Sequence, residues 1–169
     1  MKIEQLSLAN EENDVVNKVK SCVFTGHRDL MDGFSMQLLR KGIEIAIEEG
    51  CTIFYNGMAM GFDLLAAEEL LKQKKKHPNL KLISCIPCYG QEKYFTDKDK
   101  KRYAKILKKA DEKILLSETY YNGCMQVRDK YMAERADMMI AYCKKDTGGT
   151  AYTVKLFKKL HPFANIIFL

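Results

Sequence analysis

Two arginines and three glycine-containing turns are the residues of this chain best suited to bind a charged ligand. Thr25-Gly-His-Arg28 and Gly57-Met-Ala-Met-Gly-Phe-Asp63 combine glycines with hydroxyl, imidazole, guanidinium and carboxylate groups. Thr147-Gly-Gly-Thr150 is a third such turn, and Arg128 stands alone before it. Arginine can bind phosphate with two parallel hydrogen bonds, and a glycine turn that opens a helix offers free backbone N–H groups. The spacing therefore predicts a site for phosphate.

Single residues within these stretches have both a chemical and a structural interpretation. His27 could donate to phosphate or take part in acid–base chemistry, or belong to a plain surface turn. Asp63 could contact a sugar or a base, or simply cap the helix that follows it. Arg128 falls in the predicted first turn of a helix, where a cation is unfavourable, and this indicates an anion nearby. The alternative is a pair with Asp129 or Glu134 on a solvated face.

Apolar runs alternate regularly with helical patterns from about residue 20 onward. The sequence predicts strands near 21–25, 52–55, 80–86, 113–116, 137–142 and 165–169, with a helical pattern before each later strand. This order predicts an α/β fold of three layers, with a mainly parallel sheet of about six strands and helices on both faces. Ligands of such sheets bind beyond the carboxyl ends of the strands. The three turns and Pro87 all fall there.

Composition fits one domain that lies inside the cell. The chain has 169 residues, of which 47% are hydrophobic, and a formal net charge of +6 that permits an anionic ligand. Residues 1–19 are predicted to be a flexible or partly helical lead-in to a domain over 20–169. Because the N-terminus lacks an apolar signal core and no apolar run reaches membrane length, a cytoplasmic protein without a membrane partner is expected.

Neither the cysteines nor the lysine runs change this prediction. Cys85-Ile-Pro-Cys88 is half of a zinc site without a second half, and a redox pair would open a helix rather than precede a loop. No metal and no cofactor are therefore predicted. The lysines over 72–76 and 98–109 alternate with apolar helix positions, which is typical of solvated helix faces. A nucleic-acid patch is the alternative.

Five motifs in order resemble the YpsA-like proteins of the SLOG superfamily of Rossmann-like domains. They are Val23-Phe-Thr-Gly-His-Arg28, Gly57-Met-Ala-Met-Gly-Phe-Asp63, Ile86-Pro87 with Gln91-Glu92, Arg128-Asp-Lys-Tyr-Met132 and Gly148-Gly-Thr150. The turn at 57–63 also resembles DprA, which binds single-stranded DNA. The helix at 125–132 resembles the LOG phosphoribohydrolases, which cleave nucleoside monophosphates.

The resemblance implies a Rossmann-like domain that binds a nucleotide or nucleotide-derived ligand, with a sensor or regulatory role. LOG-like N-glycosidase activity and DprA-like binding of single-stranded DNA are the rival functions, and pairing into a homodimer is common for such domains. Thr153 stands where LOG proteins carry a glutamate on which their cleavage depends, which argues against LOG-type cleavage. Asp129 stands where YpsA-like proteins usually carry asparagine, so an amide donor is replaced by an acidic group and the contact to the ligand is expected to differ. The expected ligand-binding residues are Thr25, Gly26, His27, Arg28, Gly57, Ala59, Gly61, Asp63, Pro87, Arg128, Gly148, Gly149 and Thr150.

Overall fold

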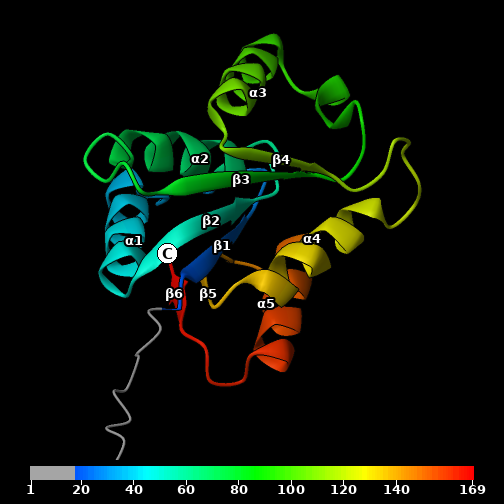
Figure 1. Cartoon of the computed structure of the whole chain (residues 1–169). Helices are drawn as coiled ribbons and strands as arrows, with labels where there is room; N and C mark the ends of the chain where they lie inside the picture. Colours follow the sequence, from blue (N-terminus) through cyan, green and yellow to red (C-terminus); the bar gives the residue numbers. More distant parts are fainter. Residues whose placement is uncertain (1–17) are drawn as a thin grey trace, which may run out of the picture.

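A computed structural model describes residues 18–169 as one parallel sheet covered by helices on both faces (Figure 1). The predicted lead-in over 1–19 lies almost entirely outside the described residues. The elements are β1 (Lys20–Gly26), α1 (Met36–Glu48), β2 (Cys51–Asn56), α2 (Phe62–Gln73), β3 (Lys81–Ile86), the short 3₁₀ helix η1 (Gln91–Tyr94), α3 (Asp97–Lys109), β4 (Glu112–Leu115), α4 (Cys124–Arg135), β5 (Met138–Tyr142), α5 (Gly149–Leu160) and β6 (Ile166–Phe168).

The sheet has the order β4-β3-β2-β1-β5-β6, and every neighbouring pair is parallel. The predicted three-layer α/β fold with a six-stranded parallel sheet is therefore confirmed. The chain builds outward from β1 through β2 and β3 to β4, then crosses back to place β5 on the other side of β1. Ligands of doubly wound folds bind where the strand order reverses in this way. Here the strand order reverses between the paired strands β1 and β5, so the expected site lies at their carboxyl ends.

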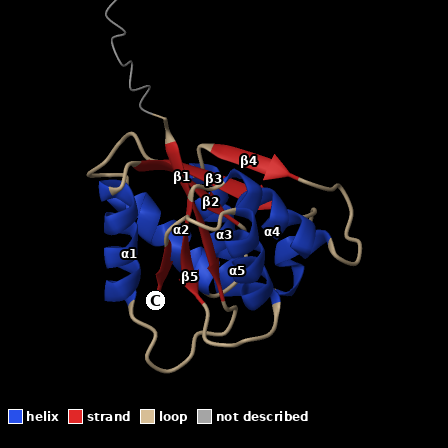
Figure 2. Ribbon diagram, turned by 90° about the horizontal axis from the view of Figure 1, so that it is seen from below, coloured by secondary structure: helices blue, strands red, loops and turns tan. Residues whose placement is uncertain are grey.

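Alternating side chains of the central strand divide the core into two layers. Cys22 and Phe24 of β1 are fully buried on the face covered by α1, α2 and α3. Val23 between them is fully buried on the opposite face, against α4 and α5. Figure 2 shows α4 and α5 side by side along one flank of the sheet. Because both faces are covered, the central strand β5 is apolar and buried along its whole length, whereas the edge strand β4 is mostly exposed.

Candidate ligand site at the β1–β5 switch point

A cavity of about 380 Å³ lies at the carboxyl ends of β1 and β5. Arg28 and Arg128 both line it, although they are far apart in the chain. The other predicted residues in its lining are Thr25, Gly26, His27, Ala59, Asp63, Gly149 and Thr150. The topology thus brings two guanidinium groups and parts of three turns to one cavity at the switch point.

Four predicted residues lie next to this cavity without lining it. Gly57 lies behind the guanidinium of Arg128, and Gly61 lines a neighbouring hollow that it shares with Arg28. Pro87 is buried just after β3, and Gly148 is the N-cap residue of α5. These four can shape the site, but their atoms do not face the main cavity.

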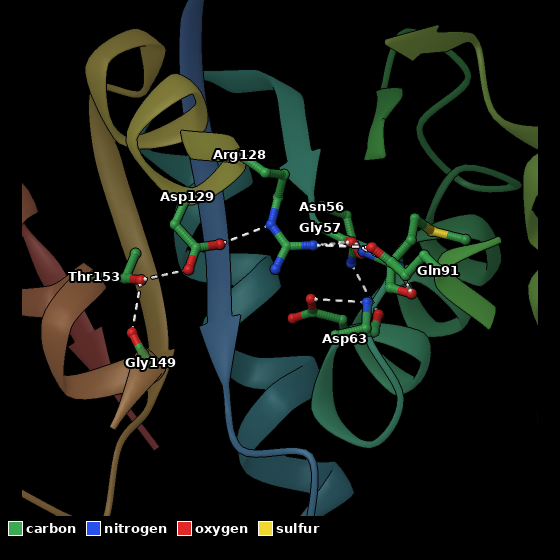
Figure 3. A network of polar contacts seen from close by, with 10 residues as sticks. Asn56, Gly57, Asp63, Gln91, Arg128, Asp129, Gly149 and Thr153 are labelled. Atoms are coloured by element: carbon green, nitrogen blue, oxygen red, sulfur yellow. Dashed lines mark hydrogen bonds and ion pairs between the residues drawn. The ribbon is translucent and has the colours of Figure 1, made fainter. Parts of the chain in front are cut away.

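Arg128 is a buried arginine held by its neighbours (Figure 3). Its Nε donates to Oδ1 of Asp129 at 2.7 Å, and its Nη1 donates to the carbonyl of Gly57 and to Oε1 of Gln91 at 3.2 Å. The prediction of a first-turn position was wrong, because α4 begins at Cys124 and Arg128 falls in the second turn. In the described part of the chain, the remaining nitrogen Nη2 has no hydrogen bond, and it points toward Asp63 in Figure 3.

The turn after β2 is built to admit this guanidinium. A β-carbon on Gly57 would come within 2.8 Å of Cζ of Arg128, so a larger residue there would require the guanidinium to move. The side-chain amide of Gln91 donates to the carbonyls of Gly57 and Met58, which fixes the turn from the η1 side. Gly61 has φ of 77°, and a β-carbon there would overlap the carbonyl oxygen of Arg28. The two predicted turns therefore interlock through their glycines.

Asp63 is a buried carboxyl group, and within residues 18–169 only one of its two oxygens takes part in a hydrogen bond. Its residue is 6% exposed, and its Oδ2 accepts a hydrogen bond from the backbone N–H of Ala59 at 3.2 Å. The amide of Asn56 donates to its backbone carbonyl at 2.8 Å. Burial raises the pKa of Asp63 to about 7, against the opposing effect of Arg128. Near neutral pH the free oxygen can therefore accept or donate a hydrogen bond toward the cavity.

Asp129 connects Arg128 to helix α5. Its Oδ1 accepts from Arg128, and its Oδ2 accepts from the hydroxyl of Thr153 at 3.1 Å. Burial alone would lower the pKa of Arg128, but the carboxylates of Asp129 and Asp63 outweigh it and raise that pKa. The predicted alternative of an Asp129 pair is thus found, although it is a buried pair rather than a solvated one.

His27 joins the ends of β1 and β5. Its Nε2 accepts a hydrogen bond from the backbone N–H of Lys144 at 2.7 Å, so the ring proton belongs on Nδ1. The ring packs edge-on against Tyr142 at 5.5 Å between centroids. Burial, and then the charge of Lys145, lowers the pKa of His27. Because Nε2 accepts from Lys144, only Nδ1 of His27 remains for donation to a ligand.

The N-cap residues of the helices that begin near the cavity differ from those of α1 and α3. The N-cap residues of α2, α4 and α5 are Gly61, Gly123 and Gly148, and none supplies a side-chain hydrogen bond. In contrast, α1 and α3 are capped by the hydroxyls of Ser35 and Thr96, which accept from their own helices. Uncapped N–H groups at helix starts attract anions. The first N–H groups of α2 and α4 donate to the backbone carbonyls of His27 and Tyr121, both at 3.1 Å. Within residues 18–169, the N–H groups of Gly149 and Thr150 at the start of α5 make no such bond and lie at the cavity.

Sequence reasoning missed several residues of the cavity wall. Tyr120, Asn122, Gly123, Met125 and Gln126 also line it, from the end of the β4–α4 loop and the start of α4. The sequence places the 117–128 stretch at a strand end, but its residue types single out only Arg128. The amide and aromatic side chains of this strand-end loop could have identified it as part of a binding site. Gln91 was likewise identified only as part of the family motif.

The paired cysteines do not form a site of their own. Cys85 is buried in the core layer beneath α4, while burial and the neighbouring thiol of Cys124 raise the pKa of Cys88. Among residues 18–169, no group of three or more His, Cys, Asp or Glu side chains is placed to hold a metal ion. No described helix has the length and apolar character needed to cross a membrane.

Relatives of known sequence support the resemblance. A UPF0398 protein of Halalkalibacterium halodurans is 30% identical over 116 residues, which are 67% of this chain and 61% of that protein. A UPF0398 protein of Brevibacillus brevis is 26% identical over 161 residues, covering 94% of this chain and 77% of that protein. The match to the first relative thus spans about three fifths of its length.

Solved structures show the same fold at low identity. DNA processing protein A (DprA) from Helicobacter pylori, described for its single-stranded DNA binding mode, superposes with a TM-score of 0.64 and 17% identity over 88% of this chain and 64% of that one. DprA from Streptococcus pneumoniae gives the same score and identity over 90% and 51%. The family model named YpsA matches residues 19–165. The chain is therefore a member of the YpsA family, described as the YspA SLOG family.

Proposed function

We propose that this protein binds a nucleotide or nucleotide-derived ligand in the β1–β5 cavity and acts as a sensor or regulator. The observation that carries the proposal is the set of three glycine-capped helix starts, α2, α4 and α5, around one cavity that also holds Arg28 and Arg128. The two arginines and the free N–H groups at the start of α5 favour phosphate there. The unoccupied oxygen of buried Asp63 supplies a polar partner for a sugar hydroxyl.

Different groups of the cavity bind the phosphate and the sugar of the ligand. The uncapped N–H groups at Gly149 and Thr150 and the guanidinium of Arg28 face the phosphate. The Nη2 group of Arg128 and the free oxygen of Asp63 face the sugar. Because Arg128 is held by Asp129 and by the carbonyl of Gly57, it is already in position before a ligand arrives. A preorganised group loses little side-chain entropy on binding.

Calorimetric titration with AMP, ADP, ADP-ribose and NAD tests this proposal. Arg28→Gln is expected to raise Kd about 10- to 100-fold, since a charge-assisted hydrogen bond contributes about 1.5–3 kcal/mol. Arg135→Gln is the matched control, because Arg135 lies in the last turn of α4 and does not line the cavity. Absence of binding by the unmodified protein, or an equal effect of both variants, would remove the proposal.

A hydrolytic function is the second candidate, and Asp63 is the observation that favours it. A carboxyl group with a pKa of about 7 is suited to general acid–base catalysis. Asp129 is a weaker candidate, because Arg128 and Thr153 occupy both of its oxygens. Release of free base from a nucleoside monophosphate, abolished in Asp63→Asn, would establish this activity. Binding without release would leave the sensor role in place.

Binding of single-stranded DNA is the third candidate, suggested by the likeness to DprA. It predicts an affinity for oligonucleotides that falls steeply with salt, because each neutralised phosphate releases counterions. Mononucleotide binding in the β1–β5 cavity neutralises few phosphates and predicts a shallow salt dependence instead. Fluorescence anisotropy of a labelled oligonucleotide at several salt concentrations separates the two.

A further inference from the structure

Three side chains at the rim of the cavity are exposed and without partners. Tyr120 lies in the β4–α4 loop and is 68% exposed, Asn122 follows in the same loop, and Gln126 lies in the first turns of α4. All three line the cavity. Within residues 18–169 none of their side chains makes a hydrogen bond. Figure 2 shows the loop between β4 and α4 reaching beyond the ends of the strands.

Local structure does not account for the two amides. Gln126 is three residues after the N-cap Gly123, where glutamine commonly bonds back to the N-cap N–H in a capping box. That bond is not made here. Asn122 precedes the cap and could close a turn with its own backbone, yet it does not. Both amides are therefore left with a free donor and a free acceptor beside the cavity.

The chemistry of this rim matches a nucleobase. An amide can bond in two places to adenine, whose exocyclic amino group donates next to a ring nitrogen that accepts. A tyrosine ring offers a face on which any base can stack. These three side chains are uncharged and exposed, whereas Arg128 and Asp63 of the same cavity are buried.

We propose that Tyr120, Asn122 and Gln126 form the base-binding end of the site and select a base of the adenine type. The inference rests on the proposed nucleotide-binding function and adds its base preference. The phosphate and sugar occupy the inner part of the cavity, and the base lies outward under Tyr120. Ligands that share the ribose phosphate but differ in the base are then distinguished only at this rim.

Competition between AMP, GMP and ribose 5-phosphate tests the inference. AMP is expected to bind at least about tenfold more tightly than ribose 5-phosphate, which has no base to stack or hydrogen-bond. Tyr120→Ala and the Asn122→Ala/Gln126→Ala double variant are each expected to reduce this preference severalfold while leaving ribose 5-phosphate affinity unchanged. Val127→Ala is the matched control, because Val127 is an exposed neighbour on α4 that does not line the cavity.

The outcomes separate this inference from the proposed function. Equal affinity for AMP and ribose 5-phosphate would overturn the base assignment and leave phosphate binding intact. Equal affinity for AMP and GMP would overturn the adenine preference and reduce the rim to a stacking surface. Binding of none of the three would overturn both proposals. A thermal unfolding midpoint near that of the unmodified protein verifies that each variant is folded.

Discussion

Replacing Asp63 with asparagine should change how stability depends on pH. Burial shifts the pKa of this carboxyl from 3.8 to about 7 in the folded protein. The folded state thus holds the proton more tightly than the unfolded state does. The stability that this proton provides is complete below about pH 4 and is lost as the pH rises through about 7.

The size of the effect follows from the shift. Each pKa unit corresponds to about 1.36 kcal/mol, so a shift of about three units amounts to about 4 kcal/mol when complete. Between pH 5 and pH 8 the unmodified protein should lose about 2 to 3 kcal/mol through Asp63 alone. An asparagine side chain at this position would keep an acceptor for the Ala59 N–H but would carry no ionisable proton. The Asp63→Asn variant should therefore lose less stability over this range.

Urea unfolding at pH 5, 6, 7 and 8, followed by circular dichroism, measures both proteins. The free energy of unfolding of Asp63→Asn relative to the unmodified protein should rise with pH by about 2 to 3 kcal/mol. Asp32→Asn is the matched control, since Asp32 is exposed and outside the cavity. Parallel pH profiles for the unmodified protein and Asp63→Asn would show that folding does not raise the pKa of Asp63.

Two further predictions concern the scaffold around the site. Gly61→Ala should destabilise the protein by more than Gly33→Ala. Both glycines have positive φ, which costs about 1–2 kcal/mol for alanine. Only at Gly61 would the new β-carbon also overlap the carbonyl of Arg28. Equal thermal midpoints of these two variants would contradict the interlocked turns. Arg102 donates from Nε and Nη2 to the two oxygens of Glu68, both at 2.8 Å, and a double-mutant cycle should give about 0.5–1 kcal/mol for this partly exposed pair, falling in high salt. A coupling energy unaffected by salt would show that the pair is not stabilised by charge.

Local pattern was sufficient to predict the strands and α-helices of this fold, but not the short 3₁₀ helix η1. Strand β5 is buried on both sides and reads as a continuous apolar run, and α1 shows apolar residues at helical spacing. Differences at the ends are small: β4 covers Glu112–Leu115 where 113–116 was predicted, and β6 covers Ile166–Phe168 within the predicted 165–169. Hydrophobic patterns do not predict the order of the strands in the sheet, because that order depends on which face each connecting helix packs against.

The site was only partly predictable for the same reason. Strand-end position and residue type selected Arg28, Asp63 and Thr150, and the structure places all three on one cavity. The burial of Arg128 between Asp129 and the carbonyl of Gly57 depends on contacts between segments distant in sequence, which spacing does not specify. The amides at the rim carried no motif, so only the cavity itself identified them.

Amide resonances recorded during titration with ADP test the central claim most directly. Large chemical-shift changes are expected at Gln126 of α4 and at Gly149 and Thr150 of α5, at helix starts that no side chain caps. The starts of α1 and α3, capped by Ser35 and Thr96, should be unaffected. Saturable changes confined to other surfaces, or no changes at millimolar ADP, would contradict a nucleotide site at the β1–β5 switch point.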